Sequence, residues 1–215
     1  MVSFQQAQAD TREVKANTMK HLTIILAFLM TLSSPVAAQD FDKGYAAYKA
    51  GDYQTAIEEF TPLAEAGNSN IQYVLGEWYD NGEGVPQDHT EAVKWYRLAA
   101  DQGNATAQYN LAVKYADGTG VAMDYKEANK LYRLASEQGL VDAQRNLGFV
   151  YARGKGVLQD NTTAHMWFNI AAANGQVFAS INRDALAEQM TSEDISKAQA
   201  MARECMNSNY KECGY

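Results

Sequence analysis

The residues with the clearest potential for catalysis lie near the C-terminal end of the chain. Ser208-Asn-Tyr-Lys211 has the S-x-x-K spacing that places a serine nucleophile ahead of a lysine in penicillin-recognising enzymes. Those enzymes also carry S-D-N and K-T-G motifs, and the sequence contains neither. The motif alone therefore supports a β-lactam-active or cell-wall hydrolase only as the alternative to a non-enzymatic function.

Few other side chains suggest chemistry. His89 and His165 fall in different segments, and no HExxH motif or Cys/His cluster accompanies them, so each reads as an ordinary surface histidine. The acidic pair Glu58-Glu59 lies on an expected helix face and is interpreted as solvated. The sequence thus predicts no catalytic residue, no metal ligand and no cofactor.

The two cysteines have a structural interpretation. Cys205 and Cys213 are the only thiols, and on one continuous helix they would lie about 12 Å apart. A disulfide requires Cα atoms within about 7 Å, so the bond needs the helix to stop near residues 207–209 and the tail to fold back. Because no C-x-x-C spacing is present, we predict a structural disulfide rather than a redox site.

Length and composition favour a folded, acidic protein. The chain has 215 residues, 47% of them apolar, with only 15 Gly and 3 Pro, which is enough apolar material for a sizeable core. Asp and Glu number 26 against 18 Lys and Arg, giving a net charge of −8. This balance argues against nucleic acid as a partner and against binding to anionic lipid.

The N-terminal segment has the pattern of a secretory signal peptide. Lys20 and His21 precede an apolar run over 22–32, and Ser33-Ser34-Pro35 ends that run before Val36-Ala37-Ala38. The run is well short of the roughly 20 apolar residues that span a bilayer. We therefore predict that residues 1–38 are an N-terminal extension and signal peptide, removed after Ala38. The product would be periplasmic or secreted, without stable membrane insertion.

The rest of the chain repeats with a period of 36 residues, which predicts units over 68–103, 104–139 and 140–175. Each unit reads as two helices joined by a loop with two glycines. An aspartate then occupies the N-cap position of the second helix, and Glu91 and Glu127 would complete capping boxes in the first two units. The columns that share this step are Gly67/103/139/175, Gly82/118/154, Gly84/120/156, Leu75/111/147, Tyr79/115/151, Asp88/124/160 and Ala92/128/164.

The pattern A-x-x-x-L-G-x-x-Y-x-x-G-x-G-V-x-x-D-x-x-x-A-x-x-W-Y-x-x-A-A-x-x-G resembles the Sel-one-like repeat, a relative of the tetratricopeptide repeat. The resemblance implies an all-α, right-handed α-solenoid of antiparallel helix pairs. Residues 39–67 have a shorter turn, so they resemble a tetratricopeptide-like N-terminal capping pair. Residues 176–215 lack the glycine loop and read as C-terminal capping helices, as expected of solenoid ends.

The resemblance also supplies the expected function. It implies a non-enzymatic scaffold or adaptor in the bacterial cell envelope that binds a protein, a peptide or an envelope component. Some cysteine-rich solenoids of this family are linked to β-lactam binding, but their regularly spaced cysteine pairs are missing here. Acylation by a labelled penicillin, lost in Ser208→Ala, would distinguish the hydrolase alternative.

Helix geometry predicts where a partner would bind. Positions 71, 72, 75, 76 and 79 span the core side of the first helix of a unit, and the opposite side falls in the groove that first helices line in tetratricopeptide proteins. An alternative is that Trp78, Val113 and Phe149 pack on neighbouring repeats and that the asparagines only follow the family consensus. The predicted partner-binding residues are Tyr73, Val74, Glu77, Trp78, Tyr109, Asn110, Val113, Lys114, Arg145, Asn146, Phe149, Val150 and Arg153.

Overall fold

The structure, a computed structural model, describes residues 41–213, and the predicted signal peptide lies outside them. In this part of the chain ten helices and no strand are present. Their bounds are α2 (Phe41–Ala50), α3 (Tyr53–Glu65), α4 (Ser69–Asn81), α5 (His89–Asp101), α6 (Ala105–Asp117), α7 (Tyr125–Glu137), α8 (Val141–Arg153), α9 (Asn161–Ala173), α10 (Val177–Ala187) and α11 (Ser192–Asn207).

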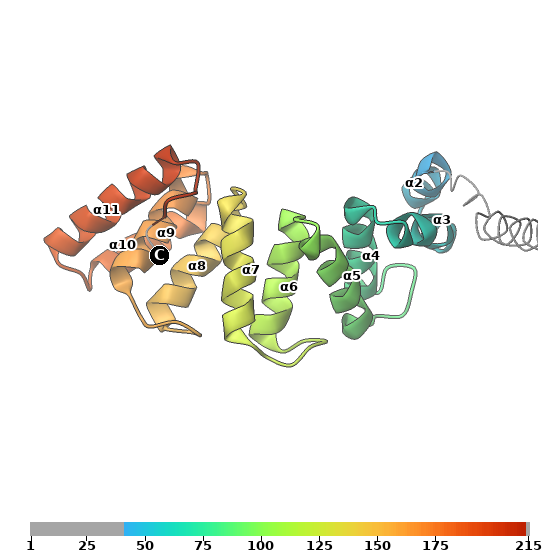
Figure 1. The fold of residues 1–215 in the computed structure, drawn as a ribbon, viewed down its shortest axis with the longest axis horizontal. Helices are drawn as coiled ribbons and strands as arrows, with labels where there is room; N and C mark the ends of the chain where they lie inside the picture. Colours follow the sequence, from blue (N-terminus) through green and yellow to red (C-terminus); the bar gives the residue numbers. More distant parts are fainter. Residues whose placement is uncertain (1–40, 214–215) are drawn as a thin grey trace, which may run out of the picture. The chain divides into compact units, whose positions relative to one another are not determined.

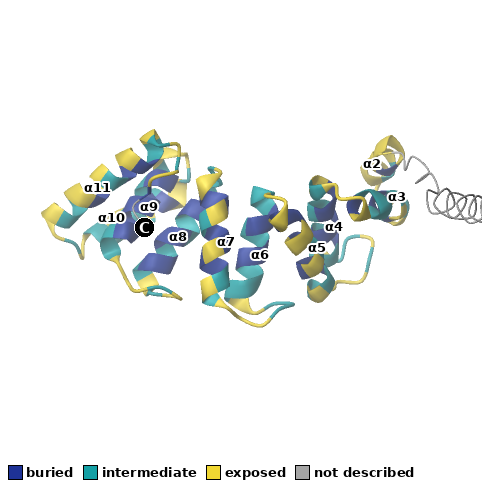
Figure 2. Ribbon diagram, in the orientation of Figure 1, coloured by how far each residue is buried: buried dark blue, intermediate teal, exposed yellow. Residues whose placement is uncertain are grey.

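The helices form consecutive pairs that stack side by side (Figure 1). Each helix from α2 to α9 packs against the next one in the chain, and α11 packs against α9. Buried residues lie where neighbouring helices meet, whereas α2 and α11 keep long exposed stretches (Figure 2). This is the all-α repeat solenoid that the 36-residue period predicts.

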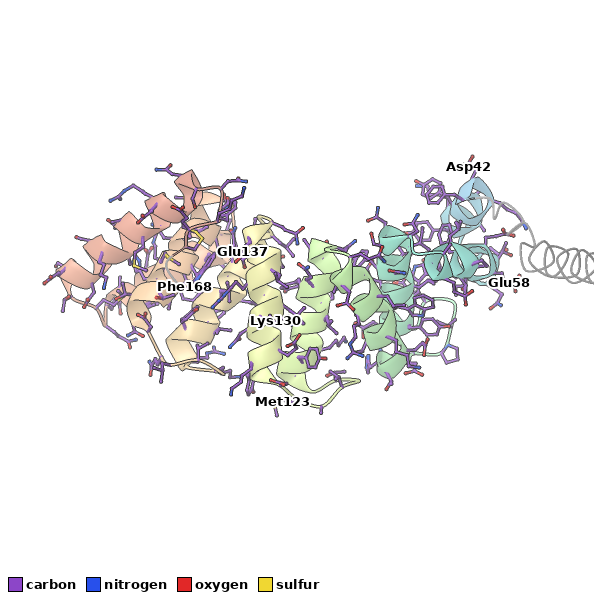
Figure 3. All side chains as sticks on the ribbon, viewed as in Figure 1. Asp42, Glu58, Met123, Lys130, Glu137 and Phe168 are labelled. Carbon is purple, nitrogen blue, oxygen red and sulfur yellow. A yellow bond between two sulfur atoms is a disulfide. The ribbon has the colours of Figure 1, made fainter. Side chains whose placement is uncertain are left out.

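Within each pair, a small residue of the first helix receives an aromatic ring from the second. A methyl group built on Gly76 would lie 2.6 Å from Cδ1 of Tyr96, and one built on Gly148 would collide with the ring of Phe168, which is labelled in Figure 3. Both rings are almost completely buried. The same contact joins Gly44 to Phe60 in the N-terminal pair. Glycine is therefore required here for close helix approach rather than for backbone freedom.

A ladder of buried amides runs through the stack. Gln72 donates to the carbonyl of Ala64 in the preceding helix at 2.8 Å, and its oxygen accepts from Gln102 at 2.7 Å. Gln108 with Gln138 and Gln144 with Asn174 repeat the arrangement in the next two pairs. Each buried glutamine is thus satisfied on both sides, as a polar group in a core must be.

The inter-helix loops use their predicted residues in two distinct ways. Gly82 ends α4 in the left-handed conformation, and its N–H donates to the carbonyl of Trp78. At Gly156 a side chain would come within 2.8 Å of the backbone of Tyr125, so the second glycine of the loop lets it lie against the preceding pair. The corresponding approaches occur at Gly84 and Gly120.

The second helices of the repeats begin at the predicted N-cap aspartates, but the predicted capping boxes do not form. Asp88 accepts from the N–H groups of Thr90 and Glu91, as an N-cap does. Its own N–H donates to the carbonyl of Tyr79 at 2.8 Å, so no donor remains for Glu91. Glu91 instead forms an ion pair with Lys94, and Glu127 forms one with Lys130. The prediction of reciprocal boxes was wrong because the loop backbone already occupies that donor.

Cys205 and Cys213 form a disulfide, with Cα atoms 4.4 Å apart. The geometry required by their spacing is present, because α11 ends at Asn207 and the chain turns through positive φ at Asn209 and Tyr210. Both cysteines are buried against the main core. The Tyr210 hydroxyl also contacts the side-chain amide of Asn174, so the turn is fastened to the end of α9.

Candidate partner-binding face

The predicted binding residues lie on the first helices of the three central pairs, and most are half-buried. We call the side of α4, α6 and α8 that carries them, together with the corresponding side of α10, the first-helix face. Trp78 and Val150 depart from the prediction because both are buried, with Trp78 only 3% exposed. The half-buried residues are Tyr73, Val74, Glu77, Tyr109, Asn110, Val113, Lys114, Arg145, Asn146 and Phe149, and Arg153 is exposed.

Trp78 belongs to an aromatic cluster that includes the N-terminal helix pair. Its ring stacks on Tyr48 and Phe60, with centroids 5.7 and 5.8 Å away, and meets Tyr53 edge-on. The packing interpretation therefore holds for this tryptophan. Trp78 fastens α4 to α2 and α3 and is not an exposed anchor.

At the α4 end of the face, Tyr73 and Glu77 interact directly. The Tyr73 hydroxyl donates a hydrogen bond to the Glu77 carboxylate, and burial together with that carboxylate raises the pKa of Tyr73 well above its usual value. Within residues 41–213, no ion pair neutralises Glu77. This end of the face thus presents a negative charge beside aromatic rings.

Lys114 is not available to a partner in the way the sequence suggested. Its ammonium forms an ion pair with Asp80, and the two side chains are only 12% and 17% exposed. His89 contacts the same carboxylate at 2.7 Å through Nδ1, and the Tyr96 hydroxyl lies 3.5 Å from it. Asp80 therefore organises a polar junction between the first two repeats.

The asparagines of the face contact core tyrosines. Asn110 hydrogen-bonds the hydroxyl of Tyr96, and Asn146 hydrogen-bonds the hydroxyls of Tyr109 and Tyr132. Burial raises the pKa of Tyr96, of Tyr109 and of Tyr132. The amides of Asn110 and Asn146 are thus committed to contacts between repeats, which supports the consensus interpretation over binding of an extended backbone.

The α8 end carries a cluster of arginines and phenylalanines, of which Arg153 and Phe178 are exposed. The guanidinium carbons of Arg145 and Arg153 lie 4.9 and 4.8 Å from the centre of the Phe149 ring, on which both stack. Arg145 also approaches the Phe178 ring at 5.9 Å and donates to the side chain of Asn182. In the described part of the chain, neither guanidinium is paired with a carboxylate.

Phe149 and Arg153 form a ridge between two hollows. One hollow of about 160 Å³ lies toward α6 and α7, and Asn146 and Lys155 also line it. The other, of about 270 Å³, lies toward α10 and includes Asn182. Arginine and aromatic residues, phenylalanine included, are enriched at protein interfaces.

The sequence-based prediction missed the continuation of the face onto α10. Val177, Phe178 and Ile181 are 71%, 62% and 58% exposed. Ile181 lies 36 residues after Arg145, in the same column as Tyr73 and Tyr109, so the period itself could have found it. The column was not extended because the glycine loop, which defined each unit, is missing after α9.

The candidate catalytic residues are held in structural roles. The Ser208 hydroxyl donates to the carbonyl of Cys205 and accepts from the N–H of Glu212, and it caps α11. Across residues 41–213, no hydrogen bond joins Lys211 to that hydroxyl. His165 is only 2% exposed, so the surface interpretation was wrong for it; burial lowers its pKa.

Among residues 41–213, no group of three or more His, Cys, Asp or Glu side chains is close enough to hold a metal ion. None of the helices between residues 41 and 213 has the length and apolar character needed to cross a membrane.

Comparison with known proteins identifies the repeat. The Sel1 repeat model matches residues 71–104, 105–140 and 141–176. The crystal structure of a Sel1 repeat protein from Oxalobacter formigenes is 32% identical, covers 80% of this chain and 71% of that one, and superposes with a TM-score of 0.65. A protective antigen of uropathogenic Escherichia coli strains with the SLR fold is 29% identical, covers 80% and 46% of the two chains, and gives a TM-score of 0.57.

A curated relative is also similar over part of its length. It is an exopolysaccharide production negative regulator from Rhizobium leguminosarum bv. viciae, 31% identical over 98 residues. The match covers 39% of this chain and 37% of the regulator. Proteins built from these repeats generally act as scaffolds for protein interaction. The chain therefore belongs to the Sel1 repeat family.

Proposed function

We propose that the protein is a non-enzymatic scaffold that binds another protein or a peptide through the first-helix face. The repeat family supports this class of function, and the similarity to a regulator of exopolysaccharide production fits an adaptor that acts by binding. The place of action that we propose is the periplasm or the cell exterior, after cleavage following Ala38. The buried disulfide is compatible with an oxidising compartment.

The observation that carries the proposal is the arginine–phenylalanine cluster on α8 and α10. Arg145 and Arg153 stack on Phe149 without a carboxylate partner among the described residues, and Phe178 beside them is 62% exposed. Stacking holds the two guanidinium groups in place before a partner arrives, which lowers the entropic cost of binding. A protein segment that carries a carboxylate next to an apolar side chain would fit this cluster.

The experiment is partner capture from the native cell envelope with matched variants. Phe178→Ala combined with Arg153→Gln removes one exposed ring and one exposed charge of the cluster. The control is Leu98→Ala with Leu134→Ala, which removes exposed apolar side chains from the second helices. We expect the first variant to lose partners that the control and the parent retain, with helical circular dichroism unchanged in all three. Equal capture by both variants would refute binding through this face.

Trp78 is unsuitable for that test. Because its ring is buried among Tyr48, Tyr53 and Phe60, its removal would open a cavity between helix pairs and weaken the fold. A loss of capture in such a variant could then reflect unfolding.

Export has its own test. The apolar run and small-residue exit over 22–38 support cleavage before Gln39. N-terminal sequencing of protein recovered from the periplasm or medium should begin at Gln39. Recovery of exported material that retains Met1 or Met19 would contradict the proposal.

A further inference from the structure

The N-terminal helix pair has an unusual outer surface for the end of a solenoid. Terminal repeats normally present a polar outer face, because nothing stacks on them. Here Phe41, Tyr45 and Tyr48 of α2 are 48%, 48% and 39% exposed. They lie at successive turns on one side of the helix, so their exposure forms a single aromatic stripe.

The stripe borders a pocket of about 400 Å³ between α2, α3 and α4. This volume lies within the range of roughly 300–1,000 Å³ that is typical of ligand sites. Trp78 and Phe60 form its inner wall, and their rings are nearly parallel, with an interplanar angle of 15°. The Tyr48 ring stacks on Trp78 at 5.7 Å, so the wall and the exposed stripe are continuous.

Two carboxylates lie on the pocket rim. Glu77 comes from α4 and Glu83 from the following loop, and both line the pocket. Glu77 accepts from the Tyr73 hydroxyl, and Glu83 accepts from Asn81 at 3.4 Å. Within residues 41–213, no Lys or Arg forms an ion pair with either one. The rim therefore carries negative charge that neutral donors stabilise but do not cancel.

Aromatic ring faces and uncompensated carboxylates attract the same kind of group. A lysine ammonium or an arginine guanidinium within about 6 Å of a ring centroid is held by the ring quadrupole, and a neighbouring carboxylate adds direct attraction. The stripe already shows this preference within the chain, because the Lys49 ammonium lies 6.0 Å from the centroid of Tyr45. An acidic or purely apolar occupant would leave the two carboxylates without a counter-charge.

We propose that this pocket receives a lysine or arginine side chain of the bound protein, with its cationic end between the rings of Tyr45 and Tyr48 and the carboxylates of Glu77 and Glu83. The inference rests on the proposed scaffold function and names one feature of the partner. The aliphatic stem of the side chain would lie along the exposed ring of Phe41, as long cationic side chains do on apolar surfaces.

The test is a titration of the intact protein with two short peptides, acetyl-Gly-Lys-Gly-amide and its norleucine counterpart. The two differ only in the charged end of one side chain. Binding is followed by NMR through the indole N–H signal of Trp78, assigned from the spectrum of Trp78→Phe. We expect the lysine peptide to shift this signal in a saturable way, with affinity about fivefold or more above that of the norleucine peptide.

Charge variants then locate the effect. Glu77→Gln keeps the size of the side chain and should weaken the lysine peptide about threefold or more. Glu58→Gln removes the same charge from an exposed position of α3 that does not line the pocket (Figure 3) and should leave the affinity unchanged. Equal binding of lysine and norleucine would overturn the proposal, as would equal effects of the two variants or the absence of a saturable shift.

Failure here is distinguishable from failure of the scaffold function. Partner capture is tested at Phe178 and Arg153, which belong to other helices. If capture depends on those residues while the lysine peptide does not bind, the proposed scaffold function is supported and the proposed binding of a basic side chain in the pocket is refuted.

Discussion

The contribution of the ion pair between Asp80 and Lys114 to stability can be tested by replacing both residues with those at the equivalent positions of the next repeat. The corresponding positions one period later are Ala116 and Val150, so the next junction has apolar side chains at the same two positions. Both residue pairs occur in one chain, near the equivalent tyrosines Tyr96 and Tyr132. Introducing the second pair at the first junction gives the double variant Asp80→Ala with Lys114→Val.

Each single variant should lower the free energy of unfolding, and the two losses should differ in size. Removing one partner of a buried ion pair costs about 3–5 kcal/mol, and the residual exposure of 12% and 17% lowers this estimate. Asp80→Ala also removes the acceptor of His89, so we expect a loss of about 2–3 kcal/mol. Lys114→Val leaves Asp80 with His89 and Tyr96 as partners and should cost about 1–2 kcal/mol.

The double variant should be no less stable than Asp80→Ala, because no uncompensated charge remains. Urea unfolding followed by circular dichroism gives the change in unfolding free energy for each of the three variants. The comparison requires that the slope of this free energy against urea concentration is the same in all of them. The expected coupling between the two positions is about 1–2 kcal/mol. If the double variant loses the sum of the two single losses, the carboxylate and the ammonium do not act as a pair and the reasoning is refuted.

Three further predictions concern packing, the disulfide and buried tyrosines. Gly76→Ala should destabilise the protein by about 1–3 kcal/mol in the same assay, because the added methyl group meets the Tyr96 ring. Reducing Cys205–Cys213 should increase hydrogen exchange in α11 but not in α4–α7, and the bond should contribute less than the roughly 3 kcal/mol of a fifteen-residue loop; two titratable thiols in denatured, unreduced protein would exclude it. Because burial raises the pKa of Tyr96 and of Tyr132 when folded, their stabilising effect is complete below about pH 10 and is lost as the pH rises above it; ultraviolet titration should show both ionising only with unfolding.

Much of the fold could be predicted because the period records packing directly. The small residue at Gly76 and Gly148 recurs because an aromatic ring needs the space. The spacing of Cys205 and Cys213 left only a broken helix as a route to a disulfide, and the structure has that break. In each case a single physical requirement leaves its mark on residue type and position.

The exposure of the predicted partner-binding residues was harder to predict, because some of their positions pack against neighbouring helices. Helix geometry places Trp78 beside the outer stripe, yet α2 and α3 cover it, and their contact with α4 is not encoded in α4 alone. Lysine is usually a surface residue, but Lys114 forms an ion pair with Asp80 from the previous repeat and is mostly buried. Burial at a repeat junction depends on two sequences at once, so one helical wheel cannot settle it.

Variation between repeats therefore has two sources that the structure separates. Asp80 and Lys114 form an ion pair at one junction, and Ala116 and Val150 pack with the core at the next, so the variation at these positions carries no information about a partner. Residues that vary without a compensating neighbour are the informative ones, and they carry opposite charges at the two ends of the face. Glu77 lines the pocket beside α2, whereas Arg153 is exposed at the end of α8. The proposed partner would then present a basic residue toward α2 and an acidic one toward α10, which would set the direction in which it lies.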